Sequence, residues 1–321
     1  MSVYIQDINR TDGPAYEMLK KVNTEVPILL LSRAESINFN SKIYELACKK
    51  FVCVDFIEGG WDAKLDKTLI VGENTFDYDY MKGDGWGEMH DFLSSNKPAL
   101  YLKRELLLSD ETDTIKPIEY PNWQPDYPLD LKEDFNNRPI LAFNYWGRSH
   151  EARLILQGQF WKHAAIYGYS VCDNIYQLND FMHHERNAKK LVSFHMPFYS
   201  RVPISEIMKI NRMSKLSISL PGCGVKCFRS TGESIVNSVC VLPADNLAYS
   251  MPFIHGVNCI KFSTNNDVTG LKNEWDVMGV VEKALANQNL YDIYLESKKL
   301  ADWYQIDNYI NNYLQPLINN A

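Results

Sequence analysis

The sequence predicts an α/β fold made of two Rossmann-like domains. Short apolar runs alternate with helical patterns in both halves of the chain, which is the rhythm of βαβ units around a parallel sheet. The length of 321 residues suits two domains of ordinary size. An acidic, proline-containing stretch without periodicity, residues 109–137, separates the two halves and is the expected linker.

The first domain, residues 1–130, is expected to form a parallel sheet covered by helices. Helical patterns lie at 40–50 and 86–95, between runs of apolar residues. Those runs predict strands at 26–32, 51–56, 68–71 and 98–103.

The second domain, residues 138–300, is expected to resume the alternation. A strand at 138–147 leads into a helical pattern within 149–161. Further strands are expected at 189–198, 215–220 and 239–245, with helices near 204–213 and 229–238. From about residue 275 the pattern is helical to the end, and residues 301–321 are expected to form a separate C-terminal helix.

Composition and charge narrow the class of protein. A chain with 45% hydrophobic and 23% charged residues is an ordinary globular one, neither disordered nor fibrous. The net charge of −7 comes without a stripe of Lys and Arg, which argues against tight binding of a polyanion. We find no secretory signal pattern, and no apolar run approaches the roughly 20 residues of a membrane span. The seven cysteines are odd in number and lack zinc spacing, so we expect reduced thiols in a soluble, cytoplasmic protein.

The most informative stretch is SLPGCGVKCFRSTGES, residues 219–234, which follows an expected strand. In an open parallel sheet, ligands bind at the carboxyl ends of the strands. Gly222 and Gly224 let backbone amides approach an anion closely, and Arg229 offers a planar fork that suits phosphate. Glu233 lies four residues further on, on the same helical face, and suits the hydroxyls of a ribose. The stretch therefore fits a nucleoside diphosphate.

The same residues have a plainer interpretation. Proline and glycine after a strand are common in turns. An Arg and a Glu four residues apart are often a surface ion pair that adds little stability. The pattern taken alone leaves both interpretations open.

A longer segment, residues 215–262, resembles the donor-binding half of glycosyltransferases of the GT-B fold, and exostosin-like members in particular. The segment HGVNCIKF, residues 255–262, is similar to one in many of these enzymes, and residues 138–156 resemble the opening of their second domain. The pattern runs from a strand through Pro221, Gly222, Gly224, Arg229 and Glu233 to the strand VCVLP and the pair Pro252 and Phe253.

The resemblance implies two domains facing each other across a cleft, with the sugar donor bound mainly by the second. The last helix, containing Trp303 and Tyr304, would cross back onto the first domain. Glu233 would bind the ribose, and Arg229 would bind the diphosphate together with amides of the 222–230 loop.

Three cations would then neutralise the leaving diphosphate, so that no metal or other cofactor is required. They are Arg229, Lys226 and Arg148, of which Lys226 lies with Ser230 in the 222–230 loop. Arg148 follows the strand at 138–147 and is otherwise a surface residue at a helix start. His195 follows the core of another expected strand, and it either contacts the donor or caps that strand.

The acceptor hydroxyl needs a base if configuration inverts. The base is expected in the first domain, on a loop after a strand. Glu58, Asp62 and Asp84 are the candidates, because neighbouring glycines allow close approach of a substrate; otherwise they are solvated loop charges. Asp77 and Asp79 look like the DxD metal motif of the other main glycosyltransferase fold, but the surrounding pattern does not belong to that fold, and no metal site is predicted.

The leading prediction is an enzyme that transfers a hexosyl or pentosyl group from a UDP- or GDP-sugar to a hydroxyl acceptor, a glycan or surface polysaccharide. An alternative acceptor is a modified base of viral DNA, which the acidic pI disfavours. A sugar-nucleotide epimerase of the same fold would need no acceptor. A non-catalytic binding module would hold the donor without turnover.

Overall fold

The computed structural model divides the chain into two compact units. Unit 1 comprises Met1–Pro121, Asn246–Pro252 and Gln305–Ala321, and unit 2 comprises Asn122–Asp245 and Phe253–Tyr304. The residues that the structure describes are 3–5, 14–31, 40–56, 68–71, 74–77, 85–123, 128–145, 162, 170–172, 191–195, 203–220, 226, 231–232, 234–245, 247–262 and 277–321.

Unit 1 is built on a five-stranded parallel sheet. Its strands, in spatial order, are Val3–Ile5 (β1), Ile28–Leu31 (β2), Val52–Asp55 (β3), Leu100–Lys103 (β6) and Ile115–Pro117 (β7). Every residue of β2, β3 and β6 is buried, as expected for parallel strands covered on both faces. The order in space equals the order along the chain, so this sheet never reverses its winding.

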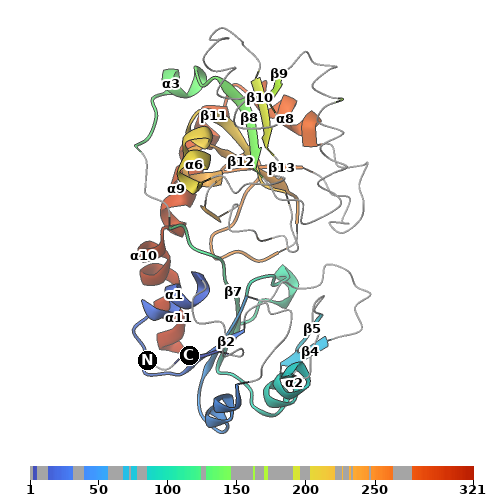
Figure 1. Cartoon of the computed structure of the whole chain (residues 1–321), viewed down its shortest axis with the longest axis vertical. Helices are drawn as coiled ribbons and strands as arrows, with labels where there is room; N and C mark the ends of the chain where they lie inside the picture. Colours follow the sequence, from blue (N-terminus) through green and yellow to red (C-terminus); the bar gives the residue numbers. More distant parts are fainter. Residues whose placement is uncertain are drawn as a thin grey trace. The chain divides into compact units, whose positions relative to one another are not determined.

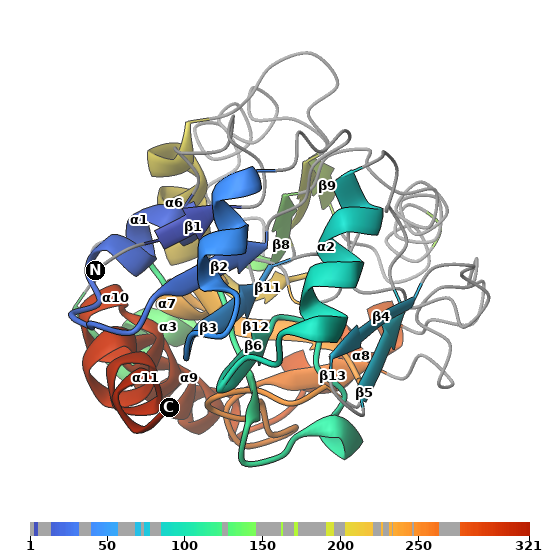
Figure 2. The same ribbon diagram turned by 90° about the horizontal axis from the view of Figure 1, so that it is seen from below.

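Helices and a small hairpin complete unit 1. They are Pro14–Lys20 (α1), the 3₁₀ helices Ser41–Leu46 (η1) and Leu108–Asp110 (η2), Gly85–Ser95 (α2), the antiparallel strands Thr68–Val71 (β4) and Asn74–Asp77 (β5), Ile306–Tyr309 (α10), the π-helix Ile310–Leu314 (η4) and Gln315–Asn320 (α11). Figure 2 shows α2 beside the β4–β5 hairpin. One apolar cluster joins η1 and α2 to the sheet through residues such as Ile43, Phe92 and Tyr101.

Unit 2 is built on a six-stranded sheet whose order is β13-β12-β11-β8-β10-β9 (Figure 1). All of its strand pairs are parallel. The strands are Ile140–Tyr145 (β8), Ser170–Cys172 (β9), Leu191–His195 (β10), Ser214–Ile218 (β11), Val239–Pro243 (β12) and Ile260–Phe262 (β13).

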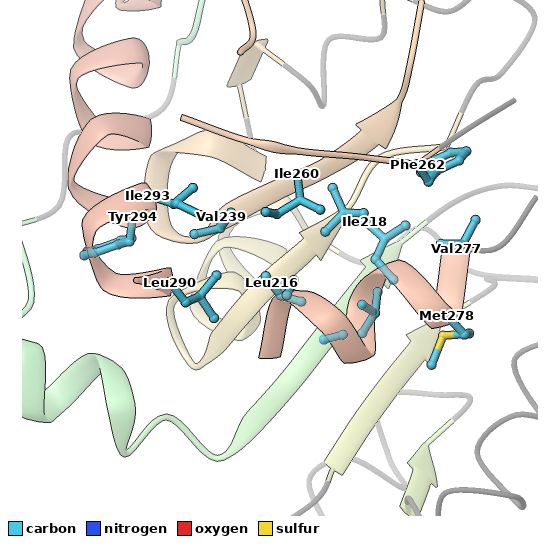
Figure 3. Packing of buried hydrophobic residues seen from close by; sticks show 14 of the residues in the cluster. Leu216, Ile218, Val239, Ile260, Phe262, Val277, Met278, Leu290, Ile293 and Tyr294 are labelled. Carbon is cyan, nitrogen blue, oxygen red and sulfur yellow. The ribbon is translucent and has the colours of Figure 1, made fainter. Parts of the chain in front are cut away.

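Among the described residues of unit 2, the helices are Lys132–Asn136 (α3), Ile204–Arg212 (α6), Ser234–Asn237 (α7), Val277–Leu285 (α8) and Leu290–Tyr304 (α9). The core of the unit lies between the strands β11, β12 and β13 and the helices α8 and α9. Figure 3 shows Leu216, Val239 and Ile260 from the strands beside Leu290 and Ile293 from α9. The core therefore fixes the half of the sheet that contains β11.

The predicted fold class is confirmed: the chain forms two α/β units, each on a parallel sheet. Strands predicted from apolar runs are present at β2, β3, β6, β8, β10, β11 and β12. The run at 68–71 is also a strand, but it pairs antiparallel with β5 outside the main sheet. The helical pattern at 40–50 forms the 3₁₀ helix η1, which stops before Cys48, a residue with a positive φ of 61°.

The prediction that residues 109–137 form a linker without regular structure is wrong in part, because these residues contain the strand β7 and the helix α3. β7 is the fifth strand of the unit 1 sheet, and its neighbours Thr114 and Ile118 exchange main-chain hydrogen bonds with β6. α3 follows at Lys132–Asn136. Three residues that end in a proline carry no readable period, so the pattern concealed a strand. The helix pattern expected within 149–161 lies outside the described residues.

Candidate functional site

The sheet of unit 2 has a topological switch point between β8 and β11. From β8 the chain forms β9 and β10 on one side, and it then crosses to the other side to form β11, β12 and β13. The connections after β8 and β11 therefore leave in opposite directions. In open α/β sheets, ligands bind outside the carboxyl ends of the strands at such a reversal. The switch point is thus the place where the geometry of unit 2 favours a ligand.

The strands beside the switch point end at a common edge. Ser217 of β11 lies opposite Phe143 of β8, and His195 of β10 lies opposite Tyr145 of β8. Beyond this edge, the main-chain amide of Ser219 donates to the carbonyl oxygen of Val241 at 2.8 Å and so continues the β11–β12 pairing. The stretch 219–234 therefore begins at the carboxyl edge, beside β8, the strand that Arg148 follows in the sequence.

The structure describes few of the predicted site residues. Lys226 is 3% exposed, so its ammonium group is buried in the connection that follows β11. His195 is the last residue of β10, at the carboxyl edge. The others, Glu58, Asp62, Asp84, Arg148, Gly222, Gly224, Arg229, Ser230 and Glu233, lie outside the described residues. Their roles remain predictions.

Thr231 and Gly232 are the described residues next to Glu233, and both are buried. A methyl group added to Gly232 would lie 3.9 Å from Oδ1 of Asn122, an ordinary van der Waals distance. After Glu233 the chain enters α7, whose four residues are all buried. The residues that come before and after Glu233 in the sequence are therefore packed inside unit 2.

The carboxyl edge of unit 1 has charged residues that the sequence analysis missed. Asp55 ends β3 and lies opposite Lys103, the last residue of β6. Oδ2 of Asp55 accepts hydrogen bonds from the Tyr101 hydroxyl at 2.6 Å and from Lys103 Nζ at 3.2 Å, and all three side chains are buried. A charged residue at the end of an otherwise apolar run, Asp55 in VCVD and Lys103 in LYLK, was the available signal.

Two more charged residues follow β6 directly. Arg104 Nη2 lies 3.3 Å from Oε1 of Glu105, and both side chains are buried. The guanidinium of Arg104 also lies over the ring of Tyr120, 5.6 Å from its centroid, and Tyr120 stacks on Phe56. This edge therefore holds two buried ion pairs and an aromatic pair.

Glu119, just after β7, is a third buried acid in unit 1. Its carboxylate accepts hydrogen bonds from the amide and hydroxyl of Ser250, at 3.2 and 2.6 Å, and from the hydroxyl of Tyr309 at 3.1 Å. These contacts join the segment after β7, the excursion Asn246–Pro252 and α10, all of which belong to unit 1. With its hydrogen bonds made inside the unit, Glu119 has a structural role.

Burial keeps two thiols protonated. It raises the pKa of Cys53 well above the ordinary value, with nearby Asp55 adding to the effect and Lys103 opposing it. Burial also raises the pKa of Cys259 to about 12. Neither thiol is a nucleophile at neutral pH, because the thiolate is the reactive form.

Within the described ranges, no three His, Cys, Asp or Glu side chains are grouped so as to hold a metal ion. Of the pair that looks like a DxD motif, Asp77 ends β5 and Asp79 lies outside the described residues. No helix in the part of the chain that the structure covers combines the length and the apolar character needed to cross a membrane.

Comparison with known proteins gives a match at the level of structure alone. No family model and no curated protein sequence matches the chain. A crystal structure of a GtfA/B complex shares 11% sequence identity at a TM-score of 0.52, over 96% of this chain and 60% of the matched one.

The pneumococcal O-GlcNAc transferase GtfA, solved with UDP and GlcNAc, shares 9% identity at a TM-score of 0.50, over 95% of this chain and 59% of that one. The chain thus spans about three fifths of the length of these two proteins. At such identities the likeness shows the fold alone: two parallel-sheet α/β domains of the kind found in glycosyltransferases.

Proposed function

We propose that the protein is a glycosyltransferase that takes a sugar from a nucleoside-diphosphate donor bound at the carboxyl edge of unit 2. The observation that carries the proposal is the switch point between β8 and β11, which brings the starts of two connections together at one edge. One connection contains Arg148, and the other contains Arg229 and Glu233. The residues that fit a nucleoside diphosphate in the sequence thus follow the two strands where the topology favours a ligand.

The roles follow from the chemistry of the donor. Arg229 and Arg148 neutralise the diphosphate, and Glu233 accepts hydrogen bonds from the ribose hydroxyls. Positive charge at the diphosphate stabilises the leaving group as the glycosidic bond breaks. A matching fold in a transferase solved with UDP supports a UDP-sugar as the first donor to test.

The acceptor is proposed to be the hydroxyl group of a glycan. The five buried charged residues at the carboxyl side of the unit 1 sheet are Asp55, Lys103, Arg104, Glu105 and Glu119. Three are acids and two are bases, and each of the two bases is paired with an acid, so these residues offer no excess positive charge to a nucleic-acid backbone. This balance favours a neutral acceptor over DNA.

Calorimetric titration with UDP, GDP and TDP tests the donor site. We expect micromolar binding of one nucleotide by the wild type, with Glu233→Ala and Arg229→Ala each weakening it about tenfold or more, a loss of roughly 1.4 kcal/mol. Glu206→Ala is the matched control, because Glu206 is paired on the surface with Lys209 at 2.6 Å in α6. Absence of binding by the wild type to all three nucleotides would end the proposal.

Turnover separates the enzyme classes. A transferase consumes the donor sugar faster when a hydroxyl acceptor is added, whereas an epimerase changes the donor without any second substrate. Repeating both assays with Mn²⁺ tests the expectation that no metal is required. Donor binding without turnover, across a panel of acceptors, would instead support a binding module.

A further inference from the structure

The short helix α7 ends against two buried cations of unit 2. α7 begins at Ser234, directly after Glu233, and it leads into β12. Lys298 of α9 is 7% exposed, and its Nζ donates a hydrogen bond to the carbonyl oxygen of Val236 at 3.0 Å. Arg138, which is 6% exposed, donates from Nη1 to the carbonyl oxygen of Asn237. Two positive charges therefore meet the last two carbonyl groups of one helix.

Serine hydroxyls hold the same helix at its start and beyond its end. Ser217 of β11 donates to the hydroxyl of Ser234 at 3.0 Å. The Ser238 hydroxyl donates to the carbonyl oxygen of Ser234 at 3.2 Å, and Ser297 of α9 donates to the carbonyl oxygen of Ser238 at 3.4 Å. Neighbouring elements thus fix α7 through hydrogen bonds of defined direction as well as by packing.

This arrangement matters because a helix of four residues has little stability of its own. Helix formation needs a costly nucleus, and the last carbonyl groups of a helix lack intrahelical partners. Cations at the carboxyl end satisfy these groups and interact favourably with the helix dipole. An ammonium group is also expensive to bury unless it is hydrogen-bonded, and the carbonyl oxygen of Val236 accepts such a bond from Lys298.

We propose that Lys298 is a positioning residue for the donor site. By holding the carboxyl end of α7, Lys298 fixes the main chain of this helix back to Ser234. Ser234 directly follows Glu233 in the sequence, the residue that binds the ribose under the proposed function. Lys298 acts through Glu233 and does not itself contact the nucleotide. The inference rests on the proposed function, and it adds a residue of α9 to the machinery that selects a nucleotide with a ribose.

The test compares nucleotides with and without the hydroxyls that Glu233 would bind. Dissociation constants for UDP and 2′,3′-dideoxy-UDP are measured for the wild type and Lys298→Met. We expect Lys298→Met to weaken UDP binding about tenfold and to weaken binding of the dideoxy analogue much less. If the wild type prefers GDP, the corresponding guanosine pair is used.

Two further variants serve as controls. Lys298→Arg retains a cation that can reach the carbonyl groups and should recover most of the affinity for UDP. Lys299→Met should bind UDP as the wild type does, because Lys299 is 70% exposed and pairs with Glu296 at 2.6 Å on the surface of the same helix.

A purely structural role gives a different result. Equal weakening of both nucleotides by Lys298→Met, or no weakening of either, would overturn the inference. If Lys298→Met does not fold, Ser217→Ala removes one hydroxyl from the same helix and should weaken UDP, but not its dideoxy analogue, about twofold to threefold. Failure of the wild type to bind any nucleotide would instead remove the proposed function, and the role of Lys298 with it.

Discussion

In unit 1 the order of the strands in space follows their order along the chain. In unit 2 the strands β9 and β10 lie on one side of β8, and the strands β11, β12 and β13 lie on the other side, so the winding of the sheet reverses between β8 and β11. Both sheets are parallel. A sheet wound in one direction has no point at which neighbouring connections part, and a reversed sheet has one. The comparison teaches that the strand order, rather than the fold class, decides where the proposed donor site lies in unit 2.

The two units also compensate their buried cations differently. In unit 1, Lys103 at the carboxyl edge faces the carboxylate of Asp55. In unit 2, Arg138 precedes β8 at the amino edge, where Nη1 donates to the main-chain carbonyl groups of Ser214 and Asn237. A side-chain partner is removable by mutation, but a main-chain carbonyl is not. The difference predicts which cation can be replaced.

The largest effect is expected at Arg138. Its guanidinium also binds Asp130, with Nη2 at 2.8 Å from Oδ2, and lies over the rings of Phe135 and Tyr294. Arg138→Met leaves two buried carbonyl groups without this donor, and we expect the free energy of unfolding to fall by about 3–5 kcal/mol. Denaturant unfolding followed by tryptophan fluorescence measures the loss.

Two variants sharpen the prediction for Arg138. Adding Asp130→Asn to Arg138→Met should recover little, because the orphaned carbonyl groups remain. Lys132→Met is the matched control, since Lys132 lies over the Tyr291 ring on the surface, and it should cost less than about 1 kcal/mol. Recovery of most of the stability by Asp130→Asn would refute the idea that main-chain partners make this cation irreplaceable.

A smaller effect is expected in unit 1, and it should be reversible. Lys103→Met leaves the buried carboxylate of Asp55 without its cation, which we expect to cost about 3 kcal/mol of unfolding free energy. Asp55→Asn in the same chain removes the stranded charge and keeps an acceptor for the Tyr101 hydroxyl. The double variant should therefore lie within about 1 kcal/mol of the wild type.

The double-mutant cycle decides the comparison between the units. A large coupling energy in the cycle at Asp55 and Lys103, beside a small one at Asp130 and Arg138, supports the contrast. Additive losses at Asp55 and Lys103 would count against it, because they would mean that the pair interacts little and that each side chain is held by other neighbours.

Apolar runs and motif spacing predicted most of the fold and part of the candidate site. The apolar runs at 26–32, 51–56 and 98–103 predicted β2, β3 and β6, because continuous apolar sequence is typical of parallel strands that are covered on both faces. Three of the three-residue strands, β1, β7 and β9, had too little sequence to show a period, and the neighbouring strand holds each of them in place.

Contacts between distant residues were beyond sequence reasoning. Glycines and an Arg–Glu pair after an apolar run pointed to the 219–234 stretch, because that chemistry is local. Lys298 is 62 residues from Val236, and Arg138 is 99 residues from Asn237. No period or motif links such positions. The hydrogen bonds from Lys298 and Arg138 to the last carbonyl groups of α7 could therefore be found only in the folded structure, in which α9 and the residue before β8 lie at the end of this helix.

The smallest expected effect concerns thiols and leaves stability unchanged. Cys48 is exposed, whereas Cys53 in unit 1 and Cys259 in unit 2 are buried, with the pKa of each raised by burial. We expect iodoacetamide to label Cys48 at least roughly 100-fold faster than either buried thiol, because few thiolates form there and the reagent has no access. Peptide mass spectrometry after timed quenching gives the three rates separately.

Cys53 lies two residues before Asp55 on the same face of β3, so its rate also reports on the carboxyl edge of unit 1. In the Lys103→Met, Asp55→Asn double variant, we expect Cys53 to be labelled as slowly as Cys259. Faster labelling of Cys53 alone would show that the ion pair excludes the reagent from the carboxyl edge of unit 1 and that neutral side chains cannot replace it.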